Sequence, residues 1–195
     1  MKIIVFGATG WVGRHVATEA LQRGHEVVGV VRDPAAVTAP DSRVTVVSAI
    51  SPRPNSRGLP APSLEANSRA LIAGLRAAGG RRVLYVGGAS SQEVAPGQAL
   101  ADQPDFPEAY RTEAREGRDA RAVWRREAQE LDWTYLSPAA EIAPGERTGT
   151  YRTSGDQLLV DANGKSFISF EDYAVAVLDE LEHPTHIGQR FGVAY

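Results

Sequence analysis

Three glycines near the start of the chain have the spacing of a phosphate-binding turn. Gly7 follows the apolar run 2–6, and Gly10 and Gly13 follow at intervals of three. In such turns the first glycine lets a strand turn sharply, the second leaves room for a phosphate, and the third lets the next helix pack closely. Thr9 adds a hydroxyl donor, and the free N–H groups at a helix start attract an anion. The pattern predicts that this turn binds the pyrophosphate of a dinucleotide.

Two charged residues follow the second apolar run, 27–31, about 20 residues beyond the turn, where ribose recognition is decided. An acidic residue there accepts hydrogen bonds from the ribose hydroxyls of NAD, whereas an arginine pairs with the 2′-phosphate of NADP. Arg32 precedes Asp33 and is the better placed of the two. We therefore expect NADP as the cofactor and NAD as the second choice, against the alternative of an ordinary solvent-exposed turn.

Few side chains are candidates for chemistry on a substrate. Ser90 and Ser91 follow the apolar run 82–86, and they either hydrogen-bond a substrate or only stabilise their loop. Trp11 either lines a substrate site or is a plain packing residue. Tyr110 is a candidate too, although its spacing favours a buried helix face. The catalytic residue stays unknown beyond Ser90, Ser91 and Tyr110.

A metal site is not expected. The chain has no cysteine, which also excludes disulfides and thiol catalysis. Its histidines lack the spacing and the acidic partners of metal ligands, so they are expected at the surface: His15, His25, His183 and His186.

Apolar runs and amphipathic helices alternate along the chain. Strands are expected at 2–6, 27–31, 43–50, 82–86, 132–136 and 189–195, and helices at 11–23, 64–78, 110–131 and 170–182. This alternation predicts an α/β fold with a doubly wound, mostly parallel sheet. At 195 residues, one domain spanning 1–195 is expected.

The intervening segments are less regular. Residues 93–106 are expected to form an irregular surface loop. Residues 149–152 and 157–160 suggest a small β excursion around the turn at Gly155-Asp156. We expect residues 140–195 to form a β/α extension on the substrate side.

Composition excludes several partners. A net charge of −3 gives no electrostatic case for nucleic acid or a membrane surface, and no apolar run approaches the ~18 residues of a membrane span. Met1-Lys2 leads directly into a strand, so no signal peptide is expected. We expect a cytoplasmic monomer or homodimer whose partner is a small-molecule electron acceptor.

Several motifs together resemble one family, the NAD(P)-binding, NmrA-like atypical short-chain dehydrogenases often labelled NADH-flavin reductases, with biliverdin reductase B as a more distant relative. The resemblance covers nearly the whole chain and implies a Rossmann fold and hydride transfer from a nicotinamide cofactor. The matching segments are 7–13, 31–33, 86–89, 131–134, 140–149 and 169–174.

The resemblance also implies positions for the cofactor. It places Gly7, Thr9, Gly10, Trp11 and Val12 around the pyrophosphate. Arg32 falls at the adenosine 2′ position. The remaining residues implied are Ala49 and Ile50 under the ribose, Ala89 and Ser90 near the nicotinamide, and Pro138 and Ala139 at its carboxamide side.

The chain lacks the Tyr-x-x-x-Lys pair of the better-known dehydrogenases. There a nearby lysine lowers the tyrosine's pKa so that it exchanges a proton with a carbonyl. Neither of the two lysines, Lys2 and Lys165, has a tyrosine four residues earlier. The standard alcohol–ketone mechanism is therefore excluded.

The chain is also short between Val47 and Ser48, where the family has a strand–helix piece that helps hold the adenine. Either one strand serves where relatives use two, or the sequence skips a segment. The second alternative is favoured, because 44–47 and 48–51 each fit a different family strand, and it predicts a break in space between Val47 and Ser48.

Two functions follow from these residues. The first is an NAD(P)H-dependent reductase that transfers hydride to a flavin, quinone or similar flat acceptor, which needs mainly proximity and an apolar slot. The alternative is a non-catalytic NAD(P)-binding redox sensor, which the missing catalytic acid favours.

Overall fold

The computed structural model describes residues 1–30, 44–52 and 62–195. It confirms the βαβ unit expected at the N-terminus: β1 (Lys2–Phe6), α1 (Trp11–Gln22) and β2 (Glu26–Val30). Gly24, with a φ of +79°, ends α1 in the left-handed conformation that helix C-termini favour.

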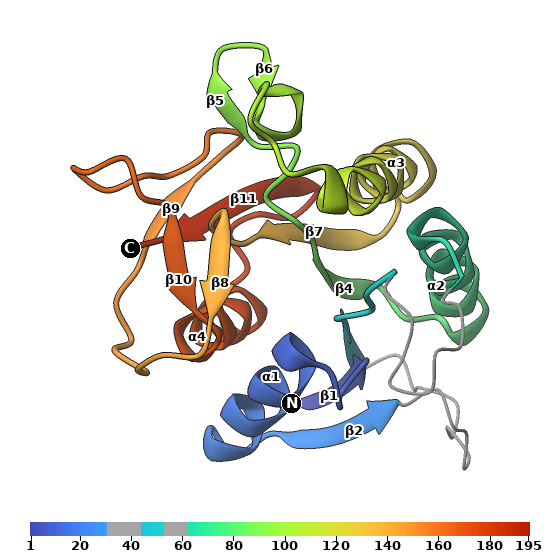
Figure 1. Cartoon of the computed structure of the whole chain (residues 1–195). Coiled ribbons are helices and arrows are strands. Elements are labelled where there is room, and N and C mark those ends of the chain that lie inside the picture. The colour runs from blue at the N-terminus through green and yellow to red at the C-terminus, as the bar shows by residue number, and fades with distance from the viewer. Residues whose placement is uncertain (31–43, 53–61) are drawn as a thin grey trace.

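The main sheet has seven strands in the order β2-β1-β3-β4-β7-β11-β9 (Figure 1). Its further members are β3 (Val44–Ser48), β4 (Arg82–Val86), β7 (Asp132–Ser137), β11 (Gln189–Ala194) and β9 (Arg152–Ser154). All neighbours pair in parallel except β9, which runs antiparallel to β11. This confirms the predicted doubly wound, mostly parallel α/β fold.

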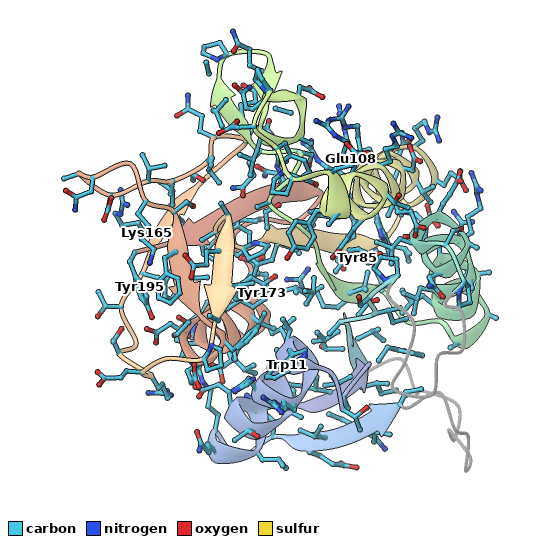
Figure 2. All side chains as sticks on the ribbon, viewed as in Figure 1. Trp11, Tyr85, Glu108, Lys165, Tyr173 and Tyr195 are labelled. Carbon is cyan, nitrogen blue, oxygen red and sulfur yellow. The ribbon has the colours of Figure 1, made fainter. Side chains whose placement is uncertain are left out.

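Helices cover both faces of the sheet. α1 packs against α4 (Phe170–Glu182) on one face, and α2 (Leu64–Ala78) packs against α3 (Arg111–Glu127) on the other (Figure 1). Successive strand residues point to opposite faces, so Ile3 joins the core beside α1 and Ile4 joins the core beside α2. Tyr173 and Tyr85 mark these two cores (Figure 2).

Serine caps set the starts of two helices. The Ser63 Oγ accepts from the Ala66 N–H at 3.2 Å, and the Ser169 Oγ accepts from the Asp172 N–H at 2.9 Å. The predicted apolar stripes behind these caps are buried: Leu64, Ser68, Leu71, Ile72 and Leu75 in α2, and Tyr173, Val177, Leu178 and Leu181 in α4.

The expectation of an irregular loop over residues 93–106 is wrong in part. β5 (Glu93–Ala95) and β6 (Gln98–Ala99) form a short hairpin, followed by the 3-10 turn η1 (Leu100–Asp102). Gly97, with a φ of +74°, makes the tight reversal, and Pro96-Gly97 is a turn signal that the sequence already carries. The hairpin projects from the sheet above the start of α3 (Figure 1).

Tyr110 does not lie on the buried face of a long helix, as its spacing had indicated. It ends the 3-10 turn η2 (Glu108–Tyr110), one residue before α3, and it is 50% exposed. α3 ends at Glu127, so Ala128 and Leu131 are buried in the segment beyond the helix. The helical spacing of the apolar residues therefore extends beyond both ends of α3, and it predicted a helix that was too long.

The C-terminal third belongs largely to the main sheet. β11 is a strand of that sheet and α4 packs on one of its faces, whereas β8 (Glu141–Ala143) and β10 (Phe167–Ser169) form a separate parallel pair. Of the expected excursion over 149–152 and 157–160, Arg152 begins β9, which pairs with β11, whereas 157–160 form only an isolated bridge from Gln157 to Glu93.

The predicted break between Val47 and Ser48 is wrong. β3 runs through both residues, which pair with Val5 and Phe6 in unbroken register. Within the described residues β2 is the edge strand, whereas the usual dinucleotide-binding order has one more strand outside it. The alternative in which one strand serves where relatives use two stays a prediction.

A buried ion pair crosses the far end of the sheet from the turn at Gly7. The Glu180 carboxylate, 2% exposed, accepts from Arg82 at 3.1 Å and from the His186 Nδ1 at 2.8 Å. Burial alone would raise the pKa of Glu180, but hydrogen bonds from His186 and Thr185 outweigh it and hold the pKa below its ordinary value. His186 therefore has a structural partner rather than a free surface position.

In the described part of the chain, no helix is long and apolar enough to cross a membrane. The same residues contain no group of three or more histidine or carboxylate side chains arranged to hold a metal ion.

Candidate functional site

The turn after β1 holds three strand ends together. Gly7 has a φ of +80°, the left-handed region that favours glycine. Its N–H donates to the Val30 carbonyl at the end of β2, at 3.0 Å. A Cβ on Gly7 would lie 2.5 Å from the Ala49 carbonyl oxygen just beyond β3. A glycine is therefore needed at position 7 for β1, β2 and β3 to end side by side.

The other two glycines close the turn onto the helix. A Cβ on Gly13 would lie 2.1 Å from the Gly7 carbonyl oxygen, so α1 approaches the turn too closely for a side chain. Gly10 donates from its N–H to the same carbonyl at 2.9 Å. A Cβ on Gly10 would lie 3.2 Å from this oxygen, a tight but less severe contact. Gly7 and Gly13 thus act as the sequence predicted for a compact strand–turn–helix, and the role of Gly10 toward a phosphate stays a prediction.

The start of α1 has the properties of an anion site. Gly10 precedes the helix without any side-chain cap, and the first turn contains no acidic residue. α2 and α4, by contrast, each have a serine hydroxyl at this place. The backbone N–H groups of Trp11, Val12 and Gly13 lack partners inside the helix, because the first turn has no preceding carbonyls. Their dipoles point toward the exposed side of the turn, where Thr9 also lies.

Trp11 lies on the surface beside this helix start (Figure 2). Its side chain is 62% exposed, and its ring stacks on Phe170 with 5.9 Å between centroids. The Arg14 guanidinium lies 4.5 Å from the Trp11 ring centroid. The ring therefore packs against Phe170, which is one of the two roles open from the sequence, and its role as a wall beside the ligand stays a prediction.

The parallel strands bring the remaining predicted cofactor residues to this same edge of the sheet. Ala49 N–H donates to the Phe6 carbonyl at 2.9 Å, and Gly87 N–H donates to the Leu136 carbonyl at 2.8 Å, so neighbouring strand ends are joined. Strand order reverses around β1, which is where open α/β sheets bind ligands. The residues gathered by these strand ends are Ala49 and Ile50 after β3, Ala89 and Ser90 after β4, and Pro138 and Ala139 after β7.

Arg32 and Asp33 lie outside the described residues. β2 ends at Val30, whose carbonyl accepts from the Gly7 N–H at the predicted edge of the sheet. The choice between NADP and NAD therefore stays a prediction from the sequence.

A buried arginine donates hydrogen bonds to the loop after β4. Arg190 of β11, whose side chain is 1% exposed, donates to both the carbonyl and the Oγ of Ser91 at 2.9 Å. Its other nitrogen donates to the Asp156 carbonyl at 3.0 Å and also contacts the Asp156 carboxylate. Ser91 thus has the loop-stabilising role that was one of its two alternatives.

Arg190 and Asp156 were not identified from the sequence as residues that shape this site. Burial raises the pKa of Asp156, but Arg190 and Arg121 together outweigh this effect and lower it. The signal was present: a lone arginine inside the apolar run 189–195 must find a carboxylate or carbonyl partner. Its partner could not be identified, because Asp156 is one of many acidic residues in the chain.

Ser90 and Tyr110 differ in their surroundings. The Ser90 carbonyl accepts from the Ala101 N–H at 2.9 Å, and the residue is half-buried at the sheet edge, which leaves its hydroxyl role a prediction. Tyr110 precedes Arg111, whose guanidinium pairs with Glu108 at 2.6 Å. Neither lysine belongs to this edge, since Lys2 begins β1 and Lys165 pairs with Glu141 at 3.5 Å. No Tyr–Lys proton relay therefore exists among these residues.

Comparison with known sequences decides the family. The sequence pattern of the NAD(P)H-binding family matches residues 7–56 and 41–184. The chain belongs to the NAD(P)H-binding family. The two matches overlap over residues 41–56, a stretch that contains β3.

Relatives span the whole NAD(P)H-binding chain. "Uncharacterized protein YwnB" of Bacillus subtilis (strain 168) is 39% identical over 214 aligned positions, covering 99% of this chain and 98% of that protein. That alignment is longer than the 195 residues of the chain, so the relative has positions without a counterpart here.

Two solved structures have closely similar folds. The crystal structure of a "putative exported protein" from Burkholderia pseudomallei is 43% identical with a TM-score of 0.86, covering 100% of both chains. That of a "putative NADH-flavin reductase" from Streptococcus pneumoniae TIGR4 is 30% identical with a TM-score of 0.81, covering 100% of this chain and 99% of that one.

The site fits a dinucleotide. An added Cβ at Gly7 or Gly13 would clash with nearby backbone, so the compact turn requires glycine there, and the uncapped start of α1 supplies N–H donors for a pyrophosphate. The residues for which contact with the cofactor stays a prediction are Gly7, Thr9, Gly10, Trp11, Val12, Arg32, Ala49, Ile50, Ala89, Ser90, Pro138 and Ala139.

Proposed function

We propose that this NAD(P)H-binding protein is a reductase that transfers hydride from NADPH to a flavin, a quinone or a similar flat acceptor. The observation that carries the proposal is the shared edge formed by the ends of β1, β3, β4 and β7. It combines a pyrophosphate cradle with a mostly apolar continuation at Ala89, Pro138 and Ala139. The similarity to a structure named as an NADH-flavin reductase supports the same acceptor class.

In this proposal, different segments along the sheet edge bind different parts of the cofactor. The start of α1 would hold the pyrophosphate, and the loops after β4 and β7 would flank the nicotinamide ring. When bound, the cofactor supplies the hydride. The chain then needs to align the acceptor and to exclude water, which Arg190 assists by keeping the Ser91 loop in place. Solvent water can deliver the proton to a flavin or quinone, so a dedicated acid is not required.

The experiment is NADPH oxidation by the purified protein with FMN, FAD and small quinones as separate acceptors. Turnover that saturates in both NADPH and the acceptor is the expected result. Tight NADPH binding without turnover on any of these acceptors would favour the redox-sensor alternative. Absence of cofactor binding would contradict both.

A further inference from the structure

A small pocket lies between the first half of α3 and the 3-10 turn η1. Its volume is about 150 Å³, and it is lined by Ala101, Asp102, Arg111, Ala114, Arg115 and Arg118. The three arginines are spaced by four and three residues, which places them on one face of the helix. Glu108, labelled in Figure 2, stands at the entrance to α3.

Two of the three arginines that line this pocket are paired with carboxylates, and the third is not. Arg118 donates to Asp102 at 3.0 Å, and Arg111 donates to Glu108 at 2.6 Å. Arg115 makes no hydrogen bond or ion pair with any other residue that the structure describes, and its side chain is exposed. One guanidinium thus faces the pocket with its donors directed to solvent. A guanidinium presents a fork of N–H donors that matches a phosphate or carboxylate.

The pocket adjoins the proposed acceptor side of the site. Ala101, which lines it, donates from its N–H to the Ser90 carbonyl at 2.9 Å. The next residue back, Leu100, donates to the Gln92 carbonyl at 2.8 Å. The wall of the pocket is therefore hydrogen-bonded directly to the loop after β4. In the sheet, β3 lies between β4 and β1, the strand that leads into the turn before α1.

We propose that this pocket binds the phosphate of a phosphorylated flat acceptor, of the flavin mononucleotide class, with Arg115 as its main ligand. The inference rests on the proposed function for the position of the acceptor ring, which would lie over the sheet edge near Ser90. Arg111 and Arg118 are already paired, so they add positive potential, while Arg115 supplies the free donors.

FMN and riboflavin test the proposal, because they share one ring system and differ in the phosphate. We measure their dissociation constants by flavin fluorescence with the full chain, as wild type, Arg115→Gln and Arg125→Gln. Arg125 is exposed on the same helix, about 15 Å further along it, and provides a matched loss of charge. Wild type should prefer FMN about tenfold or more, the size of one charge-assisted hydrogen bond. Arg115→Gln should remove most of that preference, and Arg125→Gln should keep it.

Equal affinity of the wild type for both flavins, binding of neither, or the same loss in both variants would overturn the proposal. So would an Arg115→Gln variant that loses NADPH affinity but keeps the preference for FMN, since the pocket would then serve the cofactor. Preference for FMN without NADPH oxidation contradicts the proposed function while the pocket stands. Equal turnover of both flavins, unaffected by Arg115→Gln, contradicts the pocket while the reductase stands.

Discussion

The Gly7 carbonyl oxygen lies so close to Gly13 that a Cβ added to Gly13 would be only 2.1 Å from it. This contact joins the turn after β1 to the third residue of α1 and fixes how closely the helix start approaches the sheet. The direction of its N–H groups, and hence the anion site, depends on that approach.

Gly13→Ala should therefore destabilise the protein, although alanine favours helices. The added Cβ forces the helix away from Gly7, and overpacking of this kind costs about 1–3 kcal/mol. Thermal unfolding and NADPH titration should both show a loss. Gly74→Ala is the control, because Gly74 is exposed inside α2 with nothing within 4 Å of its added Cβ. That variant should gain about 0.5–1 kcal/mol in the free energy of unfolding. Stabilisation of both variants would show that the contact at Gly13 relaxes freely.

Gly10→Ala should affect binding more than folding. Gly10 has φ −72° and ψ 171°, which any residue can adopt, and its added Cβ meets one carbonyl oxygen at 3.2 Å. The methyl group would occupy the space of the pyrophosphate, so calorimetric NADPH affinity should fall about tenfold or more. A folded variant with wild-type affinity would exclude this turn as the phosphate site.

Arg32→Ala should separate the two cofactors. If Arg32 pairs with the 2′-phosphate, its loss costs NADPH about 1.5–3 kcal/mol of binding free energy and leaves NADH nearly unchanged. Dissociation constants for both cofactors in wild type and variant give the answer directly. Equal wild-type affinity for NADPH and NADH would contradict the assignment.

Cofactor affinity should be low for the NAD(P)H-binding family. Within the described residues the sheet has no strand outside β2, the place where the usual dinucleotide-binding sheet has one more strand. We expect a dissociation constant for NADPH on the order of tens of micromolar or above. The 39% identical Bacillus subtilis relative, titrated alongside, should bind more tightly. Submicromolar binding by this chain would show that one strand suffices.

Glu180→Gln should destabilise the protein in a pH-dependent way. At neutral pH the change leaves Arg82 buried without its anion, and breaking such a pair costs about 3–5 kcal/mol. The pKa of Glu180 is lower in the folded state than its ordinary value of about 4.3. Its stabilising effect is therefore complete above that value and is lost as pH falls through the lower folded pKa.

The difference between wild type and Glu180→Gln should accordingly shrink in urea unfolding below about pH 4. Glu108→Gln is the matched control, since its ion pair with Arg111 is on an 88% exposed side chain and should contribute less than about 1 kcal/mol. A pH-independent difference for Glu180→Gln would assign the effect to packing alone.

The sequence alone determined the local elements and the ligand class. The apolar faces of α2 and α4, the stops at Gly24 and Gly79, and the glycine turn all follow from interactions between residues close in the chain. Periodicity, caps and turn residues carry that information directly. The mostly parallel arrangement of the sheet followed as well, because alternating strands and helices favour it.

Only the tertiary structure decided which distant residues meet. Arg190 and Ser91 are 99 positions apart, and nothing local specifies that they pair. The same holds for Ala101 and the loop of Ser90, which place the arginines of α3 near the loop after β4. Periodicity also failed at Tyr110, since a helix ends where its backbone finds other partners rather than where its apolar spacing stops. Side-chain type names the chemistry, but only packing of the sheet and helices brings the groups into one place.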